Sequence, residues 1–467
     1  MAQSNNNLYS VLKDTADAIR SKTGSSNLIV PREFADEIAS ISTGTSAFEV
    51  SINITNGSYI GSNIIGDNDV SIIMVEADSG YNLPSTISVS GATSYYDKDK
   101  GGIILSNPTG NVSITIICEE IIQWTFGVSG LTNSTPALTR TDDAVGKNWT
   151  KNSSTGIITS DFDNYFNFER VVHSGSTFVR IPKMYFKRTA DTIQLSNYAQ
   201  TGFSVHPCFL NESGQENNYY DVGCYKAVNQ SNVMKSVSGV SPTHSLTLAN
   251  WRTYARANNT GVDRQYFVED MRYLSLLWML WMVVFADRQT ENIMGTTWYS
   301  YSSATTGNTD SLVNNALTYP MSICGQDPTT HSFKFFGIED VIGAGYEYID
   351  GVAFSSSTIQ FSLKPSEYSS DTFTNYTSLS YTRPTDSRNI TRMGLDTTYP
   401  AIMYPSNTNT TYTTYYCDKV NYADGTRNLN FGASFFYGNY GVFFCGGDYR
   451  FSDAYDTFRA RLCSQPL

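Results

Sequence analysis

One continuous apolar run limits what this chain can fold into more than any other feature. From Tyr273 to Ala286 the sequence is YLSLLWMLWMVVFA, without a charged residue. An α-helix that crosses a bilayer needs about 20 apolar residues, so the run is too short to span a membrane. A helix that is apolar on all sides must be buried. The run therefore predicts a helix, expected over Gln265 to Ala286, at the centre of a large core, with no membrane insertion.

The composition indicates a β-rich protein with a neutral, polar surface. A chain of 467 residues can form two to four domains, and 40% hydrophobic residues suffice for a sizeable core. Only 16% of the residues are charged, and the net charge is -12. A protein that binds nucleic acid or an anionic membrane needs clustered lysine and arginine. The sequence has no such cluster, so neither is expected as a partner.

The ends and the cysteines indicate where the chain is made. Met1 to Asn7 is polar, and no apolar signal-peptide region follows it, so we expect assembly in a cytoplasm. The cysteines are odd in number and none forms a C-x-x-C pair, which favours buried free thiols over disulfides. They are Cys118, Cys208, Cys224, Cys324, Cys417, Cys445 and Cys463.

Three parts follow one another along the chain. In residues 1–46, apolar residues recur at helical spacing, Gly24 ends a first helix and Pro31 opens a second. Helices this short cannot bury their apolar faces alone, so they need a neighbour or sister chains. We predict a helical attachment and oligomerisation module here. The apolar positions are Leu8, Val11, Leu12, Ala16, Ile19, Phe34 and Ile38.

The second and third parts are predicted to be mostly β. In residues 47–120, period-2 alternation in Val50 to Ile54, Ile87 to Val89 and Val112 to Ile116 predicts a small sandwich that acts as a spacer. Residues 121–467 open with strand-like pieces such as Phe178 to Phe186, and a helix is expected over Leu248 to Ala257 before the apolar helix. The overall fold class is thus α+β, mostly β.

Short phrases resemble modules of phage proteins. The pair Ala16–Gly24 and Phe34–Ile38 resembles an N-terminal module of phage tail and baseplate proteins, and Gly80–Pro84 with Asn111–Ile117 resembles bacterial immunoglobulin-like spacers. Residues 121–467 resemble the branch of C-type-lectin-like domains that contains formylglycine-generating enzymes and the variable proteins of diversity-generating retroelements. The phrases that carry this last resemblance are Ile181–Lys183, Gly202–Pro207, Val222–Tyr225, Ser236–Val240, Asn250–Ala255, Phe336–Asp340, Gly345–Tyr348, Gly432–Phe435 and Thr457–Leu462.

The sequence carries no catalytic pattern. The copper-dependent oxidases of this branch need two thiolates, because Cu(I) prefers sulfur ligands, and the matching positions fall near Tyr437 and Val442. The histidines lie far apart, and no nucleophile or phosphate-loop motif occurs. Glu339 and Asp340 could form a carboxylate pair or a calcium site, although bonds to turn amides are favoured. We predict no enzyme, no cofactor and no metal; a glycan-degrading enzyme with two facing carboxylates is the enzymatic alternative.

The C-terminal stretch from Phe431 to Tyr455 has the composition of a binding surface. Tyrosine gives large rigid contacts, and Asn, Ser and Gly adapt their hydrogen bonds, as in antibody paratopes. In the resembled retroelement proteins this stretch is the diversified surface that faces the ligand. Strand alternation should turn about half of the residues inward. The predicted ligand contacts are Phe435, Tyr437, Asn439, Tyr440, Phe444, Asp448, Tyr449, Arg450, Tyr455 and Asp456. The alternative is a site in the polar stretches Ser300–Tyr319 or Ser378–Tyr416.

Together these observations predict a structural protein of a bacteriophage tail fibre or tip. It would bind a host-surface glycan or protein through a lectin-like domain, attach to other tail proteins through its N-terminal module, and act as a homotrimer in the virion. A bacterial surface adhesin of the same fold is the non-enzymatic alternative. The sequence does not identify the receptor, the host, a calcium dependence or an active retroelement.

Overall fold

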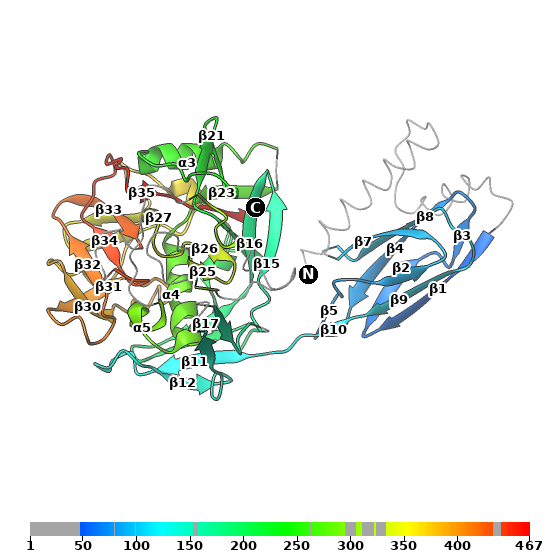
Figure 1. Ribbon diagram of the computed structural model, residues 1–467, viewed down its shortest axis with the longest axis horizontal. Coiled ribbons are helices and arrows are strands. Elements are labelled where there is room, and N and C mark those ends of the chain that lie inside the picture. The colour runs from blue at the N-terminus through cyan, green and yellow to red at the C-terminus, as the bar shows by residue number, and fades with distance from the viewer. Residues whose placement is uncertain are drawn as a thin grey trace. The chain divides into compact units, whose positions relative to one another are not determined.

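The computed structural model describes residues 47–78, 80–98, 100–152, 157–163, 165–261, 263–294, 305–310, 322–323, 333–432 and 440–467. The protein is mostly β: among the described residues 43% lie in strands and 9% in helices, and the strands form several sheets. Two compact units follow one another, the first ending at Ile122 and the second spanning Gln123–Leu467 (Figure 1). The helical module expected over residues 1–46 lies outside the described residues.

The first unit contains two four-stranded sheets. One has the order β3-β1-β9-β6, in which β1 and β9 run parallel, and the other has the order β2-β4-β8-β7. β5 and β10 form a separate two-stranded sheet. The strands are β1 (Ala47–Thr55), β2 (Gly57–Gly61), β3 (Ile64–Gly66), β4 (Val70–Ala77), β5 (Tyr81–Asn82), β6 (Ser88–Ser90), β7 (Thr93–Asp97), β8 (Gly102–Ser106), β9 (Val112–Ile117) and β10 (Glu119–Glu120).

Alternation builds the core of this unit, as the sequence predicts. In β9, Val112, Ile114 and Ile116 are buried, whereas Ser113 points outward. The buried apolar residues of the unit are aliphatic apart from Cys118, and both sheets contribute to them. The three predicted strands are confirmed as parts of β1, β6 and β9, which are neighbours in one sheet.

The second unit contains the remaining sheets. The largest has the order β29-β28-β27-β33-β34-β32-β30-β31, with β35 paired to β27; two five-stranded sheets have the orders β12-β11-β18-β17-β19 and β15-β16-β20-β36-β23. The strands of the five-stranded sheets are β11 (Thr125–Ser129), β12 (Thr139–Asp142), β15 (Glu169–His173), β16 (Ser176–Pro182), β17 (Tyr185–Arg188), β18 (Thr192–Ser196), β19 (Ser204–Val205), β20 (Tyr219–Gly223), β23 (Arg264–Val268) and β36 (Leu462–Pro466).

The other strands of this unit complete the large sheet and three small ones. The large sheet comprises β27 (Tyr346–Ser355), β28 (Thr358–Phe361), β29 (Thr377–Ser378), β30 (Arg388–Met393), β31 (Pro405–Asn409), β32 (Lys419–Tyr422), β33 (Thr426–Phe431), β34 (Cys445–Gly447) and β35 (Phe458–Arg459). The small sheets comprise β13 (Trp149–Lys151), β14 (Ile158–Ser160), β21 (Val228–Gln230), β22 (Val233–Lys235), β24 (Ser322–Ile323), β25 (Phe333–Phe335) and β26 (Ile338–Glu339).

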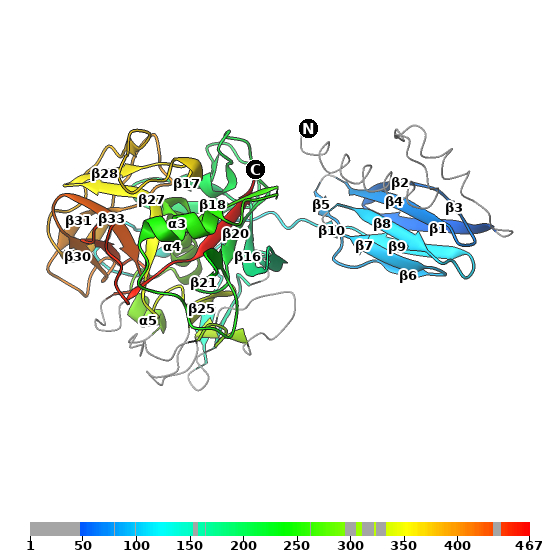
Figure 2. The ribbon, with the colours of Figure 1, turned by 90° about the horizontal axis from the view of Figure 1, so that it is seen from above.

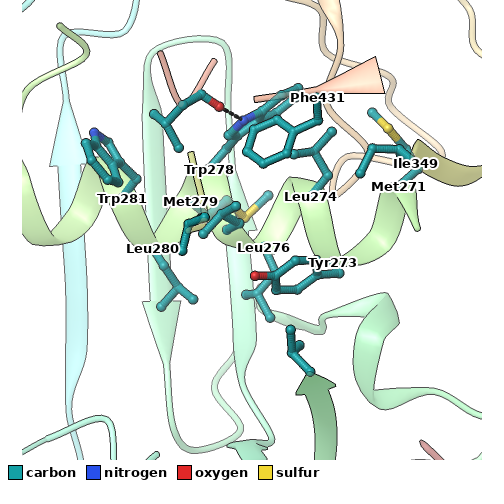
Figure 3. Packing of buried hydrophobic residues seen from close by; sticks show 14 of the residues in the cluster. Met271, Tyr273, Leu274, Leu276, Trp278, Met279, Leu280, Trp281, Ile349 and Phe431 are labelled. Atoms are coloured by element: carbon teal, nitrogen blue, oxygen red, sulfur yellow. Dashed lines mark hydrogen bonds between the residues drawn. The ribbon is translucent and has the colours of Figure 1, made fainter. Parts of the chain in front are cut away.

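The apolar run forms helix α4 (Met271–Phe285), and every residue of this helix is buried, as predicted. α4 packs against β11, β18 and β27, so it joins two sheets through one core. Figure 2 shows α3 and α4 in the middle of the unit with strands on both sides. In Figure 3 the side chains of α4 point in several directions into the core, and Trp278 donates a hydrogen bond from Nε1 to the Val442 carbonyl at 2.6 Å.

The predicted start of this helix was wrong. Residues 265–268 belong to β23, which pairs with β36, and the helix begins only after Asp270. The Asp270 carboxylate accepts hydrogen bonds from the amides of Arg272 and Tyr273, which satisfies donors that a helix leaves open at its start. At the other end, Ala286 adopts a left-handed conformation, and the Arg140 guanidinium donates to the carbonyls of Val283 and Val284.

The shorter helices are positioned by their caps. α3 (Leu248–Arg256) confirms the helix predicted over Leu248 to Ala257. Thr247 and Asn250 form a capping box at its first turn, in which each side chain bonds the other residue's backbone.

The predicted strand Phe178 to Phe186 is split at Lys183 and Met184 into β16 and β17. The remaining short helices are α5 (Thr290–Met294) and the 3-10 turns η2 (Pro207–Phe209) and η4 (Pro365–Glu367).

Candidate functional site

Phrases that lie far apart in the sequence meet at β27. Its residues Tyr346 and Glu347 pair with Phe458 and Arg459 of β35, and Glu347 also pairs with Phe431 at the end of β33. The phrases Gly345–Tyr348 and Thr457–Leu462 and the start of Gly432–Phe435 therefore lie side by side. They form a rigid frame below the C-terminal stretch that was predicted to bind a ligand.

A buried charge cluster holds this frame together. Arg461 contacts the Glu347 carboxylate at 2.8 Å, and Lys226 contacts the same carboxylate at 3.2 Å. Arg461 also donates to the backbone carbonyls of Gly223 and Glu339. Burial and then the negative charge of Glu347 raise the pKa of the nearby Glu269 well above its usual range. All four side chains are buried, and the contacts of Lys226 and Arg461 with Glu347 join distant parts of the frame.

The predicted contact residues fall into separate environments. Phe435, Tyr437 and Asn439 lie outside the described residues. Tyr440 and Phe444 are buried and stack on each other with ring centroids 4.1 Å apart, so both side chains belong to the core. Asp448 and Tyr449 are partly buried, and Arg450, Tyr455 and Asp456 are exposed.

Among the described residues of this stretch, Tyr455 has the most exposed ring. Its side chain is 52% exposed, yet its ring centroid lies 5.5 Å from that of the buried Phe458 and 5.7 Å from that of Tyr449. Tyr449 in turn packs edge-on against Phe458 at 4.7 Å. The exposed ring is thus supported from below by the frame, which reduces the side-chain entropy that a ligand contact would cost.

Polar groups flank this ring cluster. The Asp453 carboxylate accepts a hydrogen bond from the Arg450 amide, and the Arg459 guanidinium donates to the Asp456 carbonyl, so the loop backbone is fixed on both sides of Tyr455. Within the described part of the chain, Asp448 Oδ1 is buried and accepts no hydrogen bond. Burial raises the pKa of this carboxyl. Because this oxygen is buried, a ligand at the surface around Tyr455 cannot reach it.

Glu339 and Asp340 bond backbone amides, as the favoured interpretation predicts. Glu339 accepts hydrogen bonds from the amides of Gly307 and Thr309, both at 2.8 Å. Asp340 Oδ1 accepts from the Phe333 amide at 3.3 Å. The two carboxylates thus fix turns, and the described residues include no group of three or more His, Cys, Asp or Glu side chains that could hold a metal ion.

Two histidines have fixed partners in the core. His206 is the N-cap of η2, where its Nδ1 accepts from the Cys208 amide, and burial followed by the Arg272 charge lowers its pKa to about 3. His173 Nε2 lies 3.0 Å from the Asp221 carboxylate, and its Nδ1 lies 2.7 Å from the Tyr266 hydroxyl. The buried Asp221 also accepts from Arg180 and Arg264.

Ser174 lies near His173 and Asp221, so this cluster contains the three residue types of a Ser-His-Asp catalytic triad. Its hydroxyl, however, lies 2.7 Å from the Tyr266 hydroxyl, which separates it from the histidine ring. Asp221 has three partners: His173, Arg180 and Arg264. Through these contacts the cluster joins strands β15, β16, β20 and β23.

A cavity of about 510 Å³ lies in one of the polar stretches named as the alternative site. Tyr381 packs its ring over Gly394, where a side chain would collide with it, and Arg188 donates to the Gly394 carbonyl from below. Apart from Ala190, all lining residues fall within Ser378–Tyr416. They are Ala190, Ser380, Tyr381, Thr382, Arg392, Met393, Gly394, Leu395, Ser406 and Asn407. The only signal for this cavity in the sequence is the polar composition of the stretch.

The remaining predictions about the chain concern its thiols and the membrane. The six described cysteines are buried free thiols, and Val442, at a position matching a copper ligand in the resembled oxidases, is a buried apolar side chain. Among the described helices, none has the length and hydropathy to cross a bilayer. No protein-family model matches the sequence, and a search of curated proteins finds no significant relative.

Proposed function

We propose that this protein is a receptor-binding component of a bacteriophage tail fibre or tip. The observation that carries the proposal is the exposed Tyr455 ring, which packs on the buried Phe458 and lies in the same stretch as the exposed Arg450 and Asp456. A few rigid aromatic or arginine anchors usually carry most of the binding energy of an interface. The ligand is a host-surface glycan or protein.

The chemistry of this surface suits a ligand with both apolar faces and hydroxyl groups. A tyrosine ring gives a flat apolar contact and a polar tip. The exposed Arg450 can donate to carboxylate or hydroxyl oxygens, and the exposed Asp456 carboxylate can accept from hydroxyl or amide donors. The binding domain is proposed to be lectin-like, because phrases that resemble that branch meet at β27.

Roles are also proposed for the first unit, the oligomeric state and the place of assembly. The first unit is proposed to be an immunoglobulin-like spacer, since its two sheets enclose an aliphatic core. The protein is proposed to act as a homotrimer, because several weak sites that bind together raise the avidity by orders of magnitude. It is assembled in the host cytoplasm and functions in the virion, and a retroelement could diversify its C-terminal surface.

A binding assay with host cells and a glycan array tests this proposal. Changing Tyr455 and Arg450 together to Ser should reduce binding at least tenfold while the melting temperature stays within about 2 °C of the parent, because both side chains are exposed. Tyr412→Ser is the matched control, since Tyr412 is 66% exposed in the alternative stretch. Unchanged binding of the double variant, or a larger loss with the control, would contradict the proposal.

A further inference from the structure

The two sheets of the first unit differ in the faces they turn away from the core. The outer face of β1, β9 and β6 presents small polar residues in contiguous pairs: Ser51 opposite Ser113, Asn53 opposite Thr115, and Thr115 opposite Ser88. Its two exposed isoleucines stand apart, Ile64 beside Glu49 at one end and Ile117 beside Thr55 at the other. This face is therefore polar and can remain exposed to water.

The outer face of the other sheet is apolar across all four strands. Ile60 of β2 lies opposite Met74 of β4, Ile72 of β4 lies opposite Ile104 of β8, and Ile104 lies opposite Tyr95 of β7. Partners across a ladder point to the same side of a sheet, and so do Ile72 and Met74, which are two residues apart in β4, so these side chains form one patch. Ile60 is 82% exposed and Tyr95 63% exposed.

A contiguous apolar patch of this kind marks an interaction surface, whereas scattered apolar residues do not. We call the patch formed by Ile60, Val70, Ile72, Met74, Tyr95 and Ile104 the apolar sheet face. Its length across four strands is about 14 Å, from a strand spacing of about 4.8 Å. That width accommodates a helix of about 10 Å diameter.

The chain itself supplies a segment of matching chemistry. Residues 8–42 carry apolar residues at helical spacing, and helices this short need a neighbouring apolar surface. We propose that residues 8–42 pack their apolar side chains on the apolar sheet face of the same chain. The proposal goes beyond the proposed function, since it concerns how the N-terminal module is held.

The point at which the described chain begins favours this occupant. Ala47, the first residue of β1, lies opposite Gly66 of β3. A turn closed by the bond from the Asp69 amide to the Gly66 carbonyl leads directly to Val70, at one end of the apolar sheet face. Residues 43–46 can extend over about 14 Å. The preceding segment thus starts within reach of the face.

Hydrogen exchange measured by mass spectrometry on the full chain tests the proposal. In the parent, amides in residues 8–42 should exchange at least tenfold more slowly than in an unstructured peptide. Changing Ile60 and Ile104 together to Ser should remove most of that protection, while peptides of β4 and β9 keep theirs. The matched control changes Ile64 and Ile117 to Ser, which are 60% exposed each but lie on the polar face, and should leave residues 8–42 unaffected.

Light scattering on the same samples separates the possible occupants of the face. The proposal predicts the same molecular mass for the parent and both variants. A lower mass of the Ile60/Ile104 variant with unchanged protection of residues 8–42 would show that a second copy covers the face, and would overturn the proposal. The proposal would also be overturned if residues 8–42 were unprotected in the parent, if the control lost as much protection as the Ile60/Ile104 variant, or if that variant lost none. If the double variant unfolds, Tyr95→Ser alone should give the same loss to a smaller degree.

Discussion

The two units bury different kinds of side chain. In the first unit the core is a layer of aliphatic residues between two sheets, and Ser71 is its one buried polar residue among those described. The core of the second unit surrounds a helix that is buried on all sides, and it also encloses charged pairs such as Arg252–Asp350 and Arg272–Asp270. The core of the first unit is therefore a purely apolar layer apart from Ser71, whereas the core of the second also requires charged groups to find their partners.

This difference matters for binding. A buried charge must find its partner in a well-defined geometry, because an unpaired one costs several kcal/mol. The charged groups Glu347 and Arg461 thus fix the register of the strands below the Tyr455 surface. Among the described residues of the first unit, no charged side chain is buried.

The largest expected effect concerns the buried helix. Trp281→Ala should lower the free energy of unfolding of the second unit by about 3–5 kcal/mol, because the ring is fully buried among Phe285, Phe333 and Phe335. Urea unfolding followed by hydrogen exchange should show no change in the first unit. If this variant unfolds like the parent, the helix does not organise the core.

A second prediction contrasts a buried and an exposed ion pair. Asp350→Asn should cost about 3 kcal/mol, because Arg252 is buried and donates to both oxygens of Asp350 at 2.7 and 2.9 Å. Asp386→Asn, which removes a similar charge opposite Arg388 on the surface, should cost at most ~1 kcal/mol. Equal costs in thermal denaturation would mean that the charges of the second core are not critical.

A third prediction concerns pH. Burial, followed by the charge of Glu347, raises the pKa of Glu269 in the folded chain, so folding holds a proton that the unfolded chain releases above pH ~4.3. The stability from this group is complete at lower pH and is lost as the pH rises. Glu269→Gln should therefore gain about 1.4 kcal/mol relative to the parent per pH unit between pH 5 and the folded pKa. A difference that stays constant with pH would refute the assignment.

The smallest effect separates two neighbouring tryptophans of α4. Trp278→Phe should cost about 1 kcal/mol more than Trp281→Phe in urea unfolding. The reason is that Trp278 Nε1 donates to the Val442 carbonyl, whereas Trp281 Nε1 is buried and has no partner among the described residues. The reverse order would indicate that the Val442 carbonyl finds another donor.

The same contrast explains what the sequence could predict. Alternation located β1, β6 and β9, and apolar length located α4, because these signals lie within a few residues of one another. The start of α4 was misplaced because β23 owes its strand conformation to β36, at the far end of the chain. Short phrases also identified the segments that meet at β27, although their pairing with each other was visible only in the structure.

The candidate site was predictable only as a segment. The composition of Phe431 to Tyr455 indicated tyrosine-rich binding chemistry, but not which rings are exposed. Tyr440 and Tyr455 have the same side chain, and the structure places the first in a stack with Phe444 and the second at the surface. The cavity at Tyr381 and Arg392 depends on Ala190 and Arg188 from another sheet, so no local signal could have located it.

Footprinting of the full chain by hydroxyl radicals, with and without host-cell envelopes, tests the central claim most directly. Two tyrosines of similar exposure report on separate surfaces: Tyr455, 52% exposed, on the proposed site and Tyr412, 66% exposed, on the alternative stretch. Envelopes should slow the oxidation of Tyr455 at least threefold and leave that of Tyr412 unchanged. Protection of Tyr412 with Tyr455 still fully reactive would contradict the proposed site.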